Sequence, residues 1–177
     1  MREFDELDDV FNDSEEESEN KQNAINQVMN SDILLEQIEG LSFIARGSKL
    51  TDQFFDEMKD CIQIVADRLQ LTPMQTVLLL PFVNEPDDSV SRRDLSRFFG
   101  CSAPKLLALD SEMTALVRRR YLSRGRNYRG EGLSLSDMAR KAFSANQTLP
   151  VVSIDGLTPQ EFMDSFRRML FDCTYDH

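Results

Sequence analysis

The stretch SRRDLSRFFGCSAPKLLAL, residues 91–109, carries the strongest structural signals in the chain. Ser91, with Asp94 three residues later, predicts a helix start, because both side chains can accept hydrogen bonds from free N–H groups of the first turn. Gly100 predicts the end of that helix, since glycine adopts the left-handed conformation without a Cβ penalty. Ser102 then precedes a second helix. The stretch therefore predicts two helices joined by a tight turn.

Further elements are predicted on both sides of this helix pair. Residues 72–75 (TPMQ) combine a capping threonine, a proline suited to the first turn and a capping-box glutamine, so we expect a helix from there to about Asn84. The helix that begins after Ser102 should reach about Arg120. The remaining expected elements are strands near 121–123 and 133–135, a Gly- and Arg-rich loop at 124–132, and a helix from Ser136 through Asn146.

The order helix, helix, helix, strand, loop, strand, helix over residues 72–147 resembles a winged helix-turn-helix domain. Within the turn, the small Ser96 lets two helices approach, Gly100 permits the bend, and apolar residues hold the crossing angle. Those apolar residues are Leu95, Phe99, Cys101, Leu106 and Leu109. The resemblance implies a mainly α fold, with a three-helix core and a small β-hairpin wing.

Residues 22–71 are predicted to form an N-terminal helical hairpin. Apolar residues recur at three- and four-residue steps over 31–46 and over 51–70. Ser31 and Thr51 can cap the two helices, and Gly47 can end the first. The four-residue link implies antiparallel helices. Their apolar stripe must be covered by the next domain or by a second copy of the chain, so a homodimer stays open.

Residues 1–21 are predicted to be an acidic disordered tail. The first twenty residues hold ten Asp or Glu residues and one Arg, and such self-repulsion disfavours a folded core. An alternative is a short amphipathic helix that docks on a protein partner, because Phe4, Leu7 and Phe11 recur at helical spacing.

Residues 148–177 are predicted to contain a linker, at 149–156, and a helix. Thr158, Pro159 and Glu161 together form a helix start, and Phe162 begins an apolar face that extends to Leu170. The chain stops just after this helix, as expected of a truncated protein.

The run 71–147, followed by the linker and this helix, resembles the N-terminal region of a group of bacterial AAA-type ATPases. The match rests on the three predicted helices between residue 72 and about residue 120, on residues 133–136 leading into the helix 138–146, and on residues 158–170. The resemblance implies an adaptor or substrate-recruiting segment, with an ATPase domain beyond His177. The sequence contains no Walker motif, so no residue is assigned to ATP.

Charge is distributed unevenly along the chain. The formal net charge is −11, yet residues 1–60 carry −12 and residues 91–147 carry +7. Such asymmetry indicates either a nucleic-acid partner or a basic segment that balances the acidic half, within one chain or across a dimer.

Composition points to a cytoplasmic protein without a cofactor. The three cysteines, Cys61, Cys101 and Cys173, form no CxxC pair, so they predict neither a zinc site nor a redox motif and fit a reducing compartment. The longest apolar run, 77–83, is too short to span a membrane.

A nucleic-acid contact is predicted from the basic residues around the turn. The exposed start of the second helix, which enters the major groove in this family, offers only Ser102 and Lys105 as polar contacts beside Ala103, Pro104 and Ala108. Binding should therefore be shape-driven, through phosphates. The candidate contacts are Arg92, Arg93, Ser102, Lys105, Arg118, Arg119, Arg120, Arg124, Arg126 and Arg129.

Catalysis is not expected. The only histidine, His177, is the last residue, so no histidine-activated nucleophile can form within the domain. Residues 125–132 have the glycine spacing of a phosphate loop, but Glu131 stands where the phosphate-binding lysine belongs. Two functions stay open: a non-catalytic module that binds DNA non-specifically, or a protein-interaction adaptor of the same shape.

Overall fold

The computed structural model describes residues 5–86, 88–127 and 130–150. Within these residues the protein is mainly α, with nine helices and one two-stranded antiparallel hairpin. The helices are α1 (Asp5–Asn30), α2 (Leu34–Ala45), α3 (Asp52–Glu57), α4 (Lys59–Leu69), α5 (Pro73–Asn84), α6 (Arg92–Phe99), α7 (Ala103–Ala108), α8 (Asp110–Arg118) and α9 (Asp137–Ser144). The strands are β1 (Leu122–Asn127) and β2 (Gly130–Leu135).

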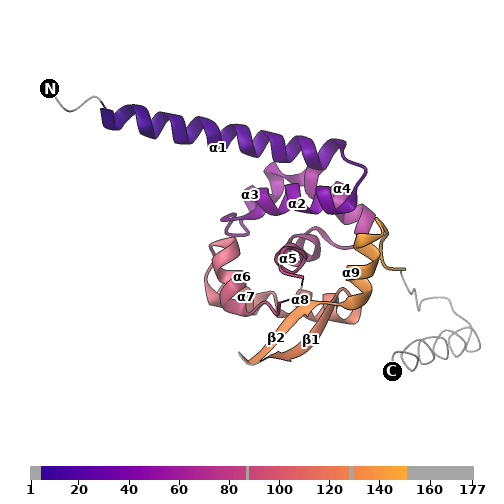
Figure 1. Cartoon of the computed structure of the whole chain (residues 1–177). Coiled ribbons are helices and arrows are strands. Elements are labelled where there is room, and N and C mark those ends of the chain that lie inside the picture. Colours follow the sequence, from indigo (N-terminus) through magenta and orange to yellow (C-terminus); the bar gives the residue numbers. More distant parts are fainter. Residues whose placement is uncertain (1–4, 87, 128–129, 151–177) are drawn as a thin grey trace, which may run out of the picture.

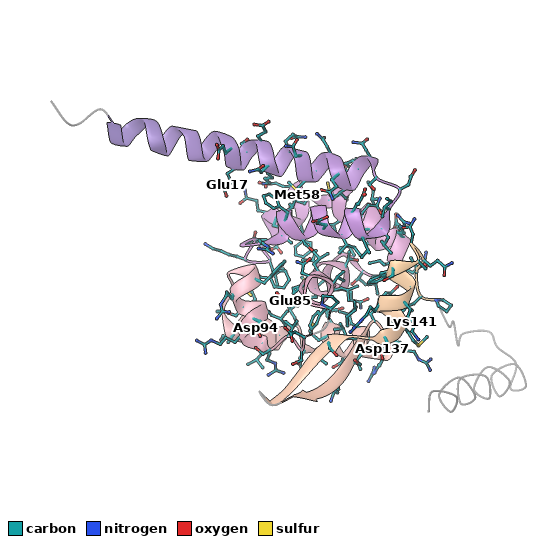
Figure 2. All side chains as sticks on the ribbon, viewed as in Figure 1. Glu17, Met58, Glu85, Asp94, Asp137 and Lys141 are labelled. Carbon is teal, nitrogen blue, oxygen red and sulfur yellow. The ribbon has the colours of Figure 1, made fainter. Side chains whose placement is uncertain are left out.

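Helix α5 is the centre of the molecule, with the other elements arranged around it (Figure 1). Its residues from Gln75 to Phe82 are all buried. A helix that is apolar on every side needs neighbours on every side, and α5 packs against α2, α4, α8 and β2. Side chains fill the space around it (Figure 2). The hydrophobic core is therefore continuous across residue 71, the predicted boundary between the helical hairpin and the domain that follows it.

The N-terminal helices pair differently from the predicted hairpin. The sequence predicted that 31–46 and 51–70 form an antiparallel pair, and α2 does contact α4, but α2 packs more extensively against α1 and α5. A close approach of backbones explains this pairing: a Cβ added at Gly40 of α2 would lie 2.8 Å from the Ala24 carbonyl oxygen of α1. The two predicted helical segments do contact each other, and α5 covers their apolar stripe, as expected if the next domain covers it. The stripe of 31–46 did not identify α1 as a further partner.

Helix α1 begins at Asp5, where the acidic composition predicted a disordered tail to residue 21. Its C-terminal part is anchored on α2 by the buried residues Ala24 and Val28. A helix that is already nucleated extends cheaply through residues of high helix propensity, such as Glu and Gln. The N-terminal part of α1 projects away from the body of the protein (Figure 1).

Two segments predicted as single helices are each broken. The segment 51–70 is divided at Met58 into α3 and α4, and the segment after Ser102 is divided at Leu109 into α7 and α8. Met58 is buried and Leu109 is half-buried, so both breaks turn an apolar side chain toward the core. Helical periodicity in the sequence does not reveal these breaks, because it persists across both.

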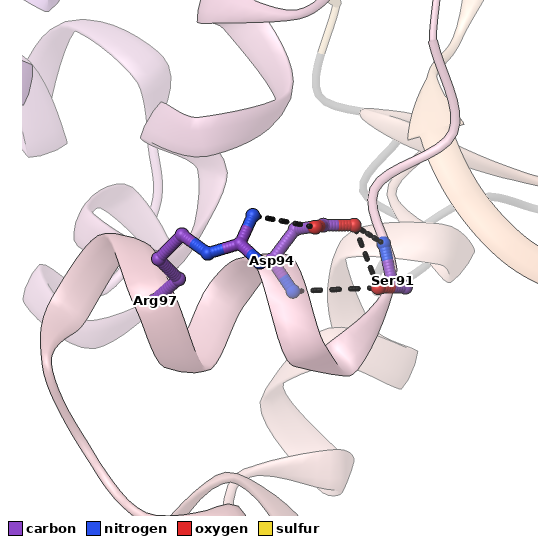
Figure 3. Close-up of polar contacts among 3 residues, drawn as sticks. All are labelled: Ser91, Asp94 and Arg97. Carbon is purple, nitrogen blue, oxygen red and sulfur yellow. Dashed lines mark hydrogen bonds and ion pairs between the residues drawn. The ribbon is translucent and has the colours of Figure 1, made fainter.

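The predicted helix boundaries around residues 72–100 are confirmed. Thr72 and Gln75 form a complete capping box at the start of α5. Ser91 and Asp94 form another at the start of α6, where the Ser91 N–H donates to Asp94 Oδ2 at 3.0 Å (Figure 3). Gly100 adopts the left-handed conformation, with φ of 67°, at the end of α6.

The hairpin follows α8 and is longer than the strands expected at 121–123 and 133–135. β1 pairs with β2 from Leu122 opposite Leu135 to Asn127 opposite Gly130. The other edge of β2 bridges to the α5–α6 connection, where the Val90 N–H donates to the Leu133 carbonyl at 2.7 Å. The hairpin is thereby tied to the start of α6. Ser136 caps α9 as predicted, and the linker beyond residue 150 and the predicted helix 158–170 lie outside the described residues.

Candidate nucleic-acid interface

Helices α6 and α7 meet through a turn whose inner side is apolar, as the sequence predicts. Leu95, Phe99 and Leu106 are 3 %, 0 % and 5 % exposed, and Cys101 is also buried. Ser96 donates its hydroxyl to the Cys101 carbonyl, which secures the chain immediately after Gly100. The arrangement packs α7 against α6 and α8, and α8 against α5, with one side of α7 facing solvent.

The turn also docks on the link between α2 and α3. The Gly47 N–H donates to the Phe98 carbonyl at 2.9 Å, and the Lys49 N–H donates to the Phe99 carbonyl at 2.7 Å. A Cβ at Gly100 would lie 3.5 Å from the Gly47 Cα atom, so the two glycines bring the backbones together. The turn therefore belongs to an interface with the N-terminal helices.

Lys105, a candidate phosphate contact, is engaged at this interface. Its Nζ donates to the carbonyl oxygens of Lys49 and Leu50, at 2.8 and 2.7 Å. Two of the three N–H donors of this ammonium group are therefore used within the protein, which leaves one for a phosphate. The sequence could not reveal this contact, because the residues lie more than fifty positions apart.

Three other candidates also have partners within the protein. Arg92 forms an ion pair with Asp110, with 2.6 Å between Nη2 and Oδ1 and both side chains well exposed. Arg119 donates to the Gln70 carbonyl at the end of α4. Arg120 has a left-handed backbone, with φ of 63°, and its Nη1 lies 4.0 Å from the Met138 sulfur.

The remaining candidates are exposed or lie where side chains are not described. Arg93, Arg118 and Arg124 are exposed and form no hydrogen bond or ion pair with any described residue. Ser102 is exposed at the start of α7. Arg126 pairs with Glu131 in the hairpin register, although its side chain is outside the description, and Arg129 lies outside the described residues.

The exposed side of α7 is mainly apolar. Leu107 is 54 % exposed, and Ala103, Pro104 and Ala108 are exposed beside it in the sequence. These side chains cannot form the bidentate hydrogen bonds that distinguish base pairs. The observed surface therefore provides little for reading a DNA sequence.

A groove of about 900 Å³ lies between α6, α7, α8 and the hairpin. Arg92 and Arg124 both line it, so it brings together two of the predicted contacts, from α6 and β1. Its apolar lining includes Leu78, Val90, Leu95, Leu106, Met113 and Leu133. Sequence reasoning missed this groove because its lining is gathered from six elements and the α5–α6 connection.

Other chemistry receives little support from the described residues. Burial raises the pKa of the Cys61 and Cys101 thiols, which disfavours the reactive thiolate. No group of three His, Cys, Asp or Glu residues in the described ranges is placed to hold a metal ion. None of the described helices combines the length and apolarity needed to cross a membrane.

Comparisons with protein-family models, with curated proteins and with solved structures found no match to this chain. A function is therefore inferred from the residues and geometry described above.

Proposed function

We propose that residues 72–147 form a winged helix-turn-helix module that binds duplex DNA through backbone phosphates, as a cytoplasmic regulator or as the recruiting domain of an ATPase. The observation that carries the proposal is the left-handed Gly100 turn between α6 and α7, beside a hairpin tied to α6 by the Val90–Leu133 bridge. A wing held beside the motif would contact the same duplex.

The available cations favour non-specific contact. Arg93, Arg118 and Arg124 are exposed without a described partner, so their guanidinium groups are free to meet phosphates. Arg92 could join them, because an exposed ion pair such as Arg92–Asp110 contributes only about 0–1 kcal/mol. The apolar start of α7 adds little discrimination between bases. Affinity would therefore depend on charge and fall steeply with salt.

A salt titration of duplex binding tests this function. Fluorescence anisotropy of a labelled duplex, measured across a range of NaCl concentrations, should give a linear plot of log K against log salt. Arg93→Gln and Arg118→Gln should each reduce the magnitude of the slope by about one. Lys59→Gln is the matched control, because it removes the same charge from an exposed position in the acidic half.

Two results would overturn the proposal. One is the absence of duplex binding even at the lowest salt concentration. The other is an equal effect of Lys59→Gln and Arg93→Gln, which would show that net charge matters and the position of the cations does not.

A second candidate function is a protein-interaction adaptor of the same fold. It is favoured by the 54 % exposure of Leu107 and by the engagement of Lys105 with the α2–α3 link. Deletion of residues 1–20 separates the candidates. If the protein is an adaptor, DNA binding stays absent after the deletion. If the protein binds DNA and residues 1–20 mimic nucleic acid by covering its exposed arginines, the deletion strengthens DNA binding. An ATPase continuing in frame after His177 would support the recruiting role.

A further inference from the structure

We propose that the groove between α6, α7, α8 and the hairpin binds a small apolar carboxylate, an aliphatic or aromatic acid, and that its occupancy lowers the affinity for DNA. The groove is lined by side chains from both the α6–α7 motif and the hairpin. A ligand there would contact both parts of the proposed DNA-binding module. The effect on DNA affinity rests on the proposed function, and the binding of the carboxylate does not.

The size and floor of the groove favour an apolar ligand. Its volume of about 900 Å³ lies within the range of ligand sites, roughly 300–1,000 Å³. The floor is formed by buried side chains that include Leu78, Val90 and Leu95. Half-buried Leu109 and Val117 add apolar walls. Covering these surfaces with a hydrocarbon group would remove apolar area from water.

The charges around the groove favour an anion. Three charged side chains line it: Arg92, Asp110 and Arg124. Arg92 and Asp110 lie 2.6 Å apart and neutralise each other. Arg124 is left as the uncompensated cation, because it is exposed and has no described partner. A guanidinium group presents a fork of donors that suits a carboxylate.

Thr114 also lines the groove and carries a hydroxyl group. A hydroxyl both donates and accepts, so it can bind the carboxylate or a water molecule beside it. The combination of a large apolar floor and a few polar groups that fix orientation is typical of small-molecule sites.

Coupling to DNA follows from the position of Arg124. Arg124 lines the groove and is also one of the three exposed arginines proposed to contact phosphates. A carboxylate bound to its guanidinium group would compete with a phosphate for the same donors. The bound ligand would therefore weaken duplex binding, and the effect would disappear when Arg124 is replaced.

Ligand binding is tested first without DNA, on the full chain. The fluorescent aromatic sulfonate anilinonaphthalene sulfonate is the probe, dodecanoate is the competing carboxylate, and dodecanol is its neutral analogue. We expect saturable binding of the probe at one site and its displacement by dodecanoate. Calorimetry then gives the affinities of dodecanoate and dodecanol for each variant.

Matched variants identify the site. Thr114→Phe should place a ring in the groove and weaken binding, and Val117→Phe is a second such variant in case the first unfolds. Ser111→Phe adds the same ring at an exposed position of α8 that does not line the groove. Arg124→Gln should weaken dodecanoate about fivefold and leave dodecanol unchanged, as for an exposed ion pair. Arg118→Gln is its control.

The outcomes separate the site from the proposed function. Unsaturable probe binding, or undiminished affinity in folded Thr114→Phe and Val117→Phe proteins, would overturn the site. Equal dodecanoate affinity in the wild type and Arg124→Gln would overturn the carboxylate specificity. If dodecanoate binds as expected but duplex DNA never binds, the site stands and the proposed function fails. If both bind without affecting each other, the proposed coupling is wrong.

Discussion

Removal of one buried hydroxyl should measurably loosen the contact between the two halves of the chain. Tyr121, at the junction of α8 and β1, is 3 % exposed, and its hydroxyl donates to the Leu69 carbonyl at 2.7 Å. Leu69 is the last residue of α4, where carbonyl groups lack partners within the helix. Tyr121→Phe keeps the ring, which lies 6.1 Å from that of Phe143, and removes only this bond.

The expected loss in the free energy of unfolding is about 1.5 kcal/mol. A hydrogen bond contributes a net 0.5–1.5 kcal/mol, roughly, and a buried carbonyl left without a partner costs about 1–3 kcal/mol. Part of that cost should be recovered if water reaches the end of α4, so the estimate lies in the lower part of the range. For a chain of this length the midpoint of thermal unfolding should fall by about 3–6 °C.

The pH dependence provides an independent readout of the same hydroxyl. Burial raises the pKa of Tyr121 to about 12, although the charge of Arg119 acts in the opposite direction. In the unfolded chain the pKa is near its usual value of about 10. The folded protein therefore keeps this proton to higher pH, and the resulting stability, fully present below about pH 10, is lost as the pH rises toward 12. Tyr121→Phe should lose less stability than the wild type across this window.

Urea denaturation followed by far-ultraviolet circular dichroism measures both effects, at neutral pH and between pH 10 and 12. Ser123→Ala is the control, because it removes an exposed hydroxyl that contacts Ser134 across the hairpin and should change stability by less than about 0.5 kcal/mol. The reasoning would be refuted if Tyr121→Phe also stayed within about 0.5 kcal/mol of the wild type, or if its loss of stability between pH 10 and 12 matched that of the wild type.

Four further substitutions, two of them combined in a double variant, test the packing of the N-terminal helices, each by urea denaturation. In Gly40→Ala the new Cβ would meet the Ala24 carbonyl oxygen at 2.8 Å, which should destabilise the protein by about 1–3 kcal/mol. The higher helix propensity of alanine offsets about 1 kcal/mol of this loss. A variant more stable than the wild type would contradict the close approach. Ser42→Ala should stabilise by up to about 1 kcal/mol, since its buried Oγ has no partner among the described residues; a clear loss would disprove it. Asn146→Ala should lower the free energy of unfolding by about 2 kcal/mol. Arg68 Nη2 donates to the Asn146 amide oxygen at 2.8 Å, so the losses from Asn146→Ala and Arg68→Ala should not add in the double variant. Strictly additive losses would contradict this coupling.

The sequence by itself determined where several helices begin or end, above all α5 and α6. The capping boxes at Thr72–Gln75 and Ser91–Asp94 and the left-handed turn at Gly100 lie where they were predicted. These signals are local, because a cap is made by side chains and backbone groups within about four residues. The same holds for the presence of the hairpin, although its strands extend further than the sequence indicated.

Only the tertiary structure decided which faces meet and which side chains remain free. The pairing of α1 with α2 depends on a close approach at Gly40, and the engagement of Lys105 depends on two carbonyl groups of the α2–α3 link. The groove likewise gathers residues from Leu78 to Leu133. Apolar periodicity and charge reveal that a face will be buried or will bind a partner. They do not reveal the partner, because that choice depends on packing between residues far apart in the chain.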